Sequence, residues 1–82
     1  MARVIDGADK NMVGDNVRKF RIEKGMSQQA LSAKLELLAI YVCRGSISRI
    51  EDYSRTVTDI ELYAIAQVLN VNISSLIENK DN

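Results

Sequence analysis

The feature that most constrains the fold of this chain is a helical spacing of apolar residues that recurs in short segments. Apolar residues separated by four and then three positions lie on one face of a helix. The pattern occurs in two successive segments: Val13, Val17 and Phe20, then Leu31, Leu35 and Leu38. The chain of 82 residues contains no proline and only 5% aromatic residues, which suits short helices better than sheets. The sequence therefore predicts one small all-α domain.

Residues that favour helix ends set the expected boundaries. Gly25 is a residue type common just past a last helical turn, and Ser27 is a good N-cap. Thr58 and Glu61 have the spacing of a capping box, and Asn70 tolerates the left-handed conformation that ends many helices. We expect five helices, over residues 11–24, 27–38, 44–53, 59–70 and 73–78.

The later helices also carry apolar residues at helical spacing, and Asn72 is the expected cap of the last one. We expect the following residues to face the core: Ile47, Ile50, Leu62, Ile65, Ala66, Leu69, Ile73, Leu76 and Ile77. Residues 39–43 lack a helical period and predict either a tight, partly buried connector or an overlong end of the second helix. We divide the chain into a flexible N-terminal arm (1–10), one domain (11–79) and a C-terminal tail (80–82).

Several kinds of chemistry are excluded by residues that the chain lacks. It has no histidine, and its one cysteine, Cys43, can form neither an internal disulfide nor a thiolate metal cluster. No nucleophile–base pair, paired carboxylates or phosphate-binding glycine loop is recognisable, so we expect no enzyme and no cofactor, metal or small-molecule site. The absence of a disulfide framework, a signal peptide and an apolar run of about 20 residues predicts a cytoplasmic protein outside the membrane.

Charge is unevenly distributed along the chain, although the formal net charge is zero. Residues 1–55 hold ten basic and seven acidic side chains, whereas residues 56–82 hold one basic and four acidic side chains. The two parts therefore carry +3 and −3. A local basic face can bind phosphate even when the total charge is neutral.

Three stretches occur in an order that is specific to one family. They are VRKFRIEKGMSQQALSAKL from Val17, SISRIED from Ser46, and VTDIELYAIAQVLNVNISSLIE from Val57. With these motifs, residues 13–78 resemble the Cro/phage-repressor (XRE-type) helix-turn-helix family. The resemblance implies a compact bundle of five short helices of the lambda-repressor-like type, with a helix-turn-helix that binds double-stranded DNA.

The resemblance also implies which residues contact the bases. The second helix of a helix-turn-helix enters the major groove, and residues 44–53 would form this recognition helix. Arginine can bind guanine with two hydrogen bonds, serine can bond bases or phosphate, and glycine lets the backbone approach closely. The implied base contacts are Arg44, Gly45, Ser46, Ser48 and Arg49. From composition alone, the same set is an ordinary solvated helix face.

Contacts to the DNA backbone are implied for residues outside the recognition helix. Gln28 resembles a phosphate-contacting glutamine of the family, Ser27 stands beside it, and Arg55 lies where the family often has a phosphate-binding cation. Arg18 and Lys19 either add to the basic surface that contacts the DNA backbone or are ordinary solvent-exposed charges. A further implied feature is architectural. Arg21 and Glu51 match a pair that joins the first and third helices in the family.

The chain departs from the family pattern between the second and third helices. Residues 36–43 add about five residues to a turn that is usually short in the family. Tyr41 is expected to cover the core, with contact to a DNA backbone as the alternative. Cys43 is expected to be a small residue at the cap of the third helix. The alternative is a redox switch, because a helix N-terminus can lower the pKa of a thiol.

Two functions remain open from the sequence. The first is a sequence-specific DNA-binding transcriptional regulator, expected to be a repressor, which acts as a homodimer on a two-fold operator. Dimer contacts would come from Leu76 and Ile77 or from Tyr63. The second is an antitoxin-like or anti-repressor module that keeps the fold for protein interaction, which the neutral net charge favours slightly.

Overall fold

The computed structural model describes residues 9–78, which form a bundle of five short helices. The expectations for residues 1–8 of the arm and for residues 79–82 lie outside the described residues. The helices are α1 (Gly14–Glu23), α2 (Gln28–Leu37), α3 (Arg44–Glu51), α4 (Asp59–Leu69) and α5 (Ile73–Ile77). Within residues 9–78 there is no strand, so the predicted all-α bundle is confirmed.

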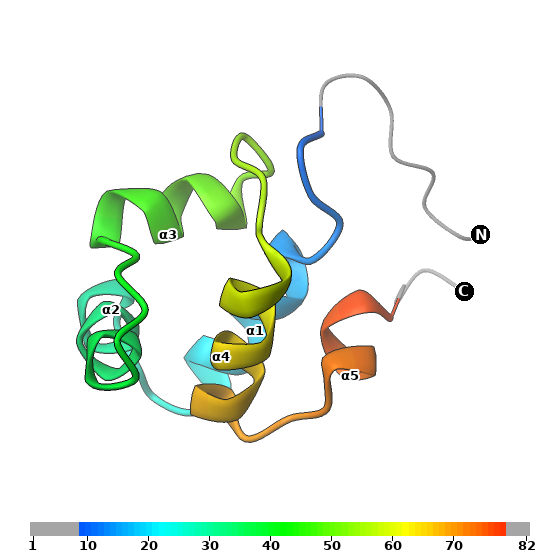
Figure 1. Ribbon diagram of the computed structural model, residues 1–82. Helices are drawn as coiled ribbons and strands as arrows, with labels where there is room; N and C mark the ends of the chain where they lie inside the picture. Colours follow the sequence, from blue (N-terminus) through cyan, green and yellow to red (C-terminus); the bar gives the residue numbers. More distant parts are fainter. Residues whose placement is uncertain (1–8, 79–82) are drawn as a thin grey trace.

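The helices surround one core, to which each of them contributes at least one buried side chain. Figure 1 shows α3 along the upper edge, α2 below one end of it, α4 and α1 in the centre and α5 at the right, on the side opposite α2. The largest side chains that are fully buried come from all five helices: Val17, Leu31, Leu35, Ile47, Ile50, Ile65, Leu69 and Leu76. Because α3 packs at the edge of this bundle, one of its sides is inward and the other faces solvent.

Helix ends follow the local signals that the sequence carries. Ser27 Oγ accepts from Ala30 N at 3.0 Å and caps α2. Thr58 Oγ1 accepts from Glu61 N at 3.1 Å, while Thr58 N donates to Glu61 Oε1 at 3.0 Å, which completes the capping box. Asn70 has the left-handed conformation, with φ 57° and ψ 46°. These three boundaries confirm the sequence expectations.

Two expected helix boundaries were wrong by more than one residue. α1 begins at Gly14 instead of residue 11, because Asn11 Oδ1 accepts from Val13 N and Gly14 N at 2.9 Å each and so holds the entry turn. α3 ends at Glu51, and Tyr53 has φ 69°, which no continuing helix allows. Asn72 precedes α5 as expected, but its side chain makes no capping hydrogen bond.

Three apolar residues expected in the core are exposed, while Phe20 and Leu62 are partly buried against it. Leu38, at the C-cap of α2, is 46% exposed because the helix ends before the next turn can bury it. Ile73 and Ile77 lie one turn apart on α5, which buries Leu76 instead. A helix of five residues is too short to bury more than one face, so Ile73 and Ile77 lie at the border between the buried face and solvent.

Candidate nucleic-acid interface

α3 presents its polar side chains outward because its apolar ones are used for packing. Ile47 and Ile50 are fully buried and Glu51 is nearly so. Arg44 and Arg49 are exposed, whereas Gly45, Ser46 and Ser48 are half-buried on the remaining sides of the helix. The five residues that the resemblance assigns to base contact therefore lie together on one accessible helix.

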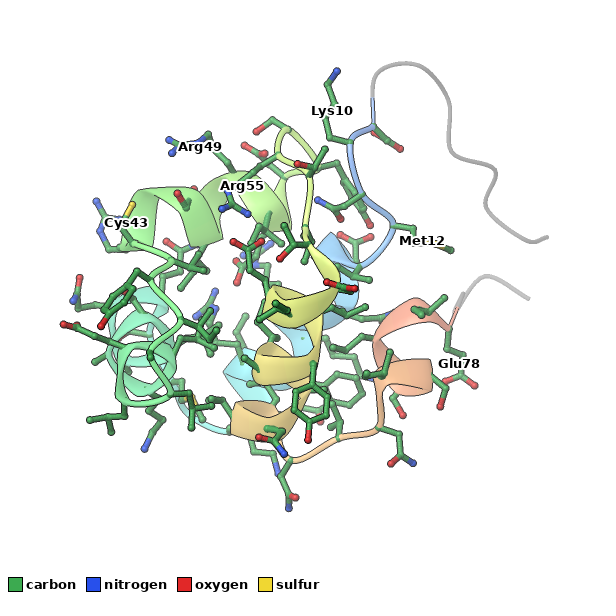
Figure 2. The ribbon with its side chains drawn as sticks, in the orientation of Figure 1. Lys10, Met12, Cys43, Arg49, Arg55 and Glu78 are labelled. Carbon is green, nitrogen blue, oxygen red and sulfur yellow. The ribbon has the colours of Figure 1, made fainter. Side chains whose placement is uncertain are left out.

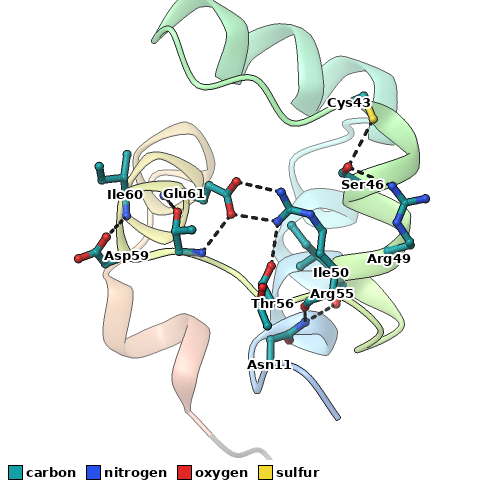
Figure 3. Close-up of polar contacts among 11 residues, drawn as sticks. Asn11, Cys43, Ser46, Arg49, Ile50, Arg55, Thr56, Asp59, Ile60 and Glu61 are labelled. Carbon is teal, nitrogen blue, oxygen red and sulfur yellow. Dashed lines mark hydrogen bonds and ion pairs between the residues drawn. The ribbon is translucent and has the colours of Figure 1, made fainter. Parts of the chain in front are cut away.

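The side chains at the N-terminal half of α3 form a small hydrogen-bonded cluster around Ser46. Arg49 Nη2 donates to Ser46 Oγ at 3.2 Å, and the Cys43 thiol lies 3.4 Å from the same oxygen (Figure 3). Arg49 Nη1 also lies 3.6 Å from the point where a Cβ on Gly45 would be. Arg49 thus folds back along the helix, and its guanidinium lies over the N-terminal half of α3.

Cys43 is the N-cap residue of α3 and is exposed. Hydrogen bonding with the Ser46 side chain lowers the pKa of its thiol, and the Ser46 backbone adds to this effect. The expectation that Cys43 occupies the cap position is correct, although its side chain makes no capping hydrogen bond. The thiol is therefore a solvent-accessible group at the leading end of α3.

The N-terminus of α2 lies against the C-terminal end of α3 through one side chain. Gln28 Nε2 donates to Glu51 Oε1 at 3.1 Å, so one N–H of the side-chain amide is engaged in a hydrogen bond within the protein. Ser27 is exposed, and its hydroxyl caps the helix. The resemblance assigns phosphate contacts to both residues. Ser27 is the more accessible of the two, and the Gln28 amide has a second N–H that does not bond to Glu51.

Arg21 and Glu51 form a buried two-point ion pair between α1 and α3. Arg21 Nε lies 2.7 Å from Glu51 Oε2, and Nη2 lies 3.1 Å from Oε1. The remaining terminal nitrogen of Arg21 donates to Met26 O at 2.8 Å. Since the side chains are 10% and 5% exposed, the pair sits out of solvent and fixes α3 relative to α1 and the turn before α2.

The two other cations assigned to the DNA backbone differ in their surroundings. Arg18 is exposed on α1. Arg55 is half-buried: its guanidinium contacts both carboxylate oxygens of Glu61 and donates to Thr56 O at 2.8 Å (Figure 3). The Glu61 carboxylate raises the pKa of Arg55, while the Arg55 guanidinium lowers that of Glu61. The charge of Arg55 is thus balanced within the protein.

The lengthened connection between α2 and α3 leaves the start of α3 accessible. Ala39 adopts φ 63° and reverses the chain, and Ile40 N donates to Leu35 O at 3.0 Å. Val42 then enters the core. Tyr41 is 76% exposed, so the expectation that it covers the core was wrong. Neighbours alternate sides in an extended segment, and the burial of Val42 turns Tyr41 outward.

Two residues before α1, Lys10 and Asn11, lie in the same region, to which the sequence analysis did not assign them. Lys10 N donates to Tyr53 O at 2.8 Å, and Asn11 Nδ2 donates to Ile50 O at 3.0 Å and Arg55 O at 2.8 Å. Figure 2 shows Lys10 and Arg49 on the upper side of the molecule and Cys43 at the left end of α3. Asparagine is a frequent capping residue, which was a usable signal for Asn11. Lys10 carries no such signal.

In the part of the chain that the structure describes, no group of three or more Cys, Asp or Glu side chains is placed to hold a metal ion. None of the helices between residues 9 and 78 has the length and apolar character that crossing a bilayer demands.

A pair of helices at the edge of an all-α bundle, the second held by a buried ion pair with its polar side outward, defines a helix-turn-helix protein. The model of the family described as "Helix-turn-helix" matches residues 17–76, most of the chain. The chain therefore belongs to this family, the Cro/repressor type that its motifs resemble, and is a DNA-binding helix-turn-helix regulator. Among curated proteins, no sequence matches the chain.

Proposed function

We propose that the protein is a sequence-specific transcriptional repressor that binds a double-stranded DNA operator through α3 and has no enzymatic activity. The single observation that carries this proposal is that α3 is packed against the bundle on one side and accessible on the other. Its start is accessible, Arg44 and Arg49 are exposed on it, and its inner side is fixed to the bundle by Ile47 and Ile50. A rigid helix with exposed arginines can enter the major groove without reorganisation of the fold.

Base reading is assigned to the side chains of α3. Arg44 and Arg49 would each bind a guanine through its O6 and N7 atoms, and Ser46 and Ser48 would contact neighbouring bases or phosphates. The hydrogen bond between Arg49 and Ser46 supports this assignment. It already restricts the arginine side chain in the free protein, so less conformational entropy is lost when the side chain binds DNA. Ser27, Gln28 and Arg18 would contact phosphates. Arg55 is the weakest of the assigned contacts, since Glu61 already neutralises it.

We further propose that the repressor acts as a homodimer on a two-fold site in the cytoplasm. Exposed apolar side chains on α4 and α5 support this: Tyr63 is 56% exposed and Ile77 is 38% exposed. Leu76, the third residue named from the sequence, is fully buried in its own chain and has no surface left for a partner. Half-sites would lie about one helical turn of DNA apart.

The proposal is tested by selecting bound duplexes from a random pool and then titrating the selected duplex at several salt concentrations. A repressor of this kind selects a two-fold motif, and its affinity falls by about 0.9 log units per log unit of salt for each phosphate contacted. The Arg44→Ala and Arg49→Ala variants should each relax the preference at one base pair of the selected motif. No selection, or affinity that does not depend on salt, contradicts the proposal.

A second candidate function is an antitoxin-like or anti-repressor protein-interaction module. It is favoured by a surface pocket between α2, α4 and α5 whose apolar lining includes Met26, Leu37, Leu38, Val68 and Val71. Leu37, at the edge of this pocket, is 85% exposed and adds to its accessible apolar surface. In this case duplex DNA would not bind even at low salt, so the same titration separates the two functions.

A further inference from the structure

The segment that enters α1 is fixed beside the loop after α3, although the two are about forty residues apart in sequence. Lys10 N donates to Tyr53 O at 2.8 Å. The amide of Asn11 donates to Ile50 O and Arg55 O, at 3.0 and 2.8 Å. None of these bonds involves the side chain of Lys10. The backbone at residue 10 is therefore held in place while its side chain stays available.

The Lys10 side chain lies on the same edge of the molecule as the proposed reading side of α3. It is exposed, and Figure 2 shows it on the upper side of the molecule, where Arg49 also lies. Within residues 9–78 no carboxylate forms an ion pair with Lys10. The carboxylate of Asp52, at the end of α3, accepts from Ser54 N at 3.0 Å instead. Lys10 thus offers an unpaired ammonium group to a partner at this edge.

The length of α3 decides which part of DNA this ammonium group would meet. α3 has eight residues, which corresponds to about 12 Å of helix. The major groove of B-DNA is also about 12 Å wide. When the start of α3 reads bases, residues beyond its C-terminal end reach the border of the groove. Phosphates line that border, so a cation there meets the backbone and not base edges.

We infer that Lys10 binds a phosphate at the border of the half-site and fixes the register of α3 in the groove. This inference rests on the proposed DNA-binding function and adds a contact from outside the helix-turn-helix. An ammonium group suits this role because it binds phosphate as a point charge, without a demand for one orientation. The contact carries no sequence information of its own.

The test compares Lys10→Ala with Lys10→Arg and with Lys34→Ala. Lys34 is an exposed lysine on α2 that lines the pocket between α2, α4 and α5, to which α3 contributes no residue. Each protein is titrated with the duplex that the wild type selects and with a scrambled duplex, at several salt concentrations. For Lys10→Ala the log–log salt dependence should become shallower by about 0.9, with an equal loss on both duplexes. Lys10→Arg and Lys34→Ala should match the wild type.

Other results overturn the inference in distinguishable ways. If the wild type binds duplex and Lys10→Ala keeps its salt dependence, Lys10 contacts no phosphate, and the proposed function stands. If Lys10→Ala instead loses preference at one base pair, Lys10 reads a base. If the wild type binds no duplex at low salt, the proposed function fails together with this inference. An unchanged thermal unfolding midpoint verifies that the variant is folded, since the backbone bond to Tyr53 remains.

Discussion

Arg55 and Glu61 face each other in a two-point ion pair, with Nη1 2.9 Å from Oε1 and Nη2 3.0 Å from Oε2. The same carboxylate accepts from Thr58 N and completes the capping box of α4. One glutamate therefore ties the loop after α3 to the start of α4 (Figure 3). The pair gives Arg55 a role in positioning this loop, which competes with a role in binding phosphate.

We expect Glu61→Gln to change how stability depends on pH. Hydrogen bonding from Arg55 lowers the folded-state pKa of Glu61 below its ordinary value of 4.5. The ionised carboxylate therefore stabilises the folded protein above pH 4.5, and this contribution is lost as the pH falls through the folded-state pKa. Glutamine keeps the capping bond but not the charge, so the variant should be less stable by about 1 kcal/mol at pH 7.

Urea unfolding followed by circular dichroism over a pH series measures this difference. The curves of wild type and Glu61→Gln should converge as the pH falls. Glu23→Gln serves as the matched control, because Glu23 is an exposed glutamate at the end of α1, and its curve should run parallel to that of the wild type. A constant gap between wild type and Glu61→Gln across the series contradicts the role given to the ion pair.

The sequence was sufficient to predict the five helices and several of their ends. Capping depends on residues three or four positions apart, so Ser27, the Thr58–Glu61 pair and Asn70 could be recognised without knowledge of the fold. The start of α3 at Arg44 could be recognised because the apolar spacing of Ile47 and Ile50 resumes there. These features depend on residues a few positions apart in the sequence, so they can be predicted without the fold.

What the sequence did not predict depends on contacts between distant segments. Asn16 donates to Leu76 O at 2.8 Å and to Glu78 O at 2.7 Å, which joins α1 to the end of α5. Asn11 makes similar bonds to the end of α3. No periodicity marks an asparagine that satisfies backbone carbonyls forty or sixty residues away. The exposure of Tyr41 escaped prediction for a related reason, since it follows from the conformation of an inserted connection.

Glu51→Ala should lower stability and DNA affinity together. Removal of Glu51 leaves the Arg21 guanidinium buried without its partner, which costs about 3–5 kcal/mol, and it releases the hydrogen bond from Gln28. The double variant Arg21→Met with Glu51→Leu buries no charge and should be more stable than Glu51→Ala alone. Chemical unfolding and duplex titration measure both effects, with Glu36→Ala on the exposed side of α2 as control. A Glu51→Ala protein of wild-type stability contradicts the role of the pair.

Gly14→Ala should destabilise the contact between α1 and α3. A Cβ at Gly14 would lie 2.5 Å from Ile50 O and 2.9 Å from Glu51 O, and these backbone atoms cannot move without shifting the end of α3. Overpacking of this kind costs about 1–3 kcal/mol. Gly45→Ala is the matched control, since its Cβ would meet only Arg49 Nη1, at 3.6 Å. Alanine is the better helix former, so Gly45→Ala should unfold at the wild-type temperature or above it. Equal unfolding midpoints for the two variants would rule out the close contact.

Arg49→Ala and Gln28→Ala should separate base contacts from backbone contacts. Arg49→Ala should cost about 1–3 kcal/mol of binding free energy and relax the preference at one base pair. Gln28→Ala should weaken binding to all duplexes alike, because a phosphate contact carries no sequence information. Titration of the selected duplex and of single-base variants of it measures the two patterns. If both variants change all duplexes by the same factor, Arg49 does not read a base.

Cys43 provides a direct measure of whether the start of α3 is covered by DNA. It is the one cysteine of the chain, it is exposed, and bonding with Ser46 lowers the pKa of its thiol. Because the thiolate is the reactive form, alkylation by iodoacetamide should proceed at a lower pH than for a free cysteine, and Ser46→Ala should slow it at neutral pH. Saturating amounts of the selected duplex should slow alkylation of the wild type, whereas a scrambled duplex at high salt should leave the rate unchanged. The same alkylation rate with and without bound duplex, measured by intact mass, would mean that DNA lies elsewhere and that α3 does not enter the groove with its N-terminal end.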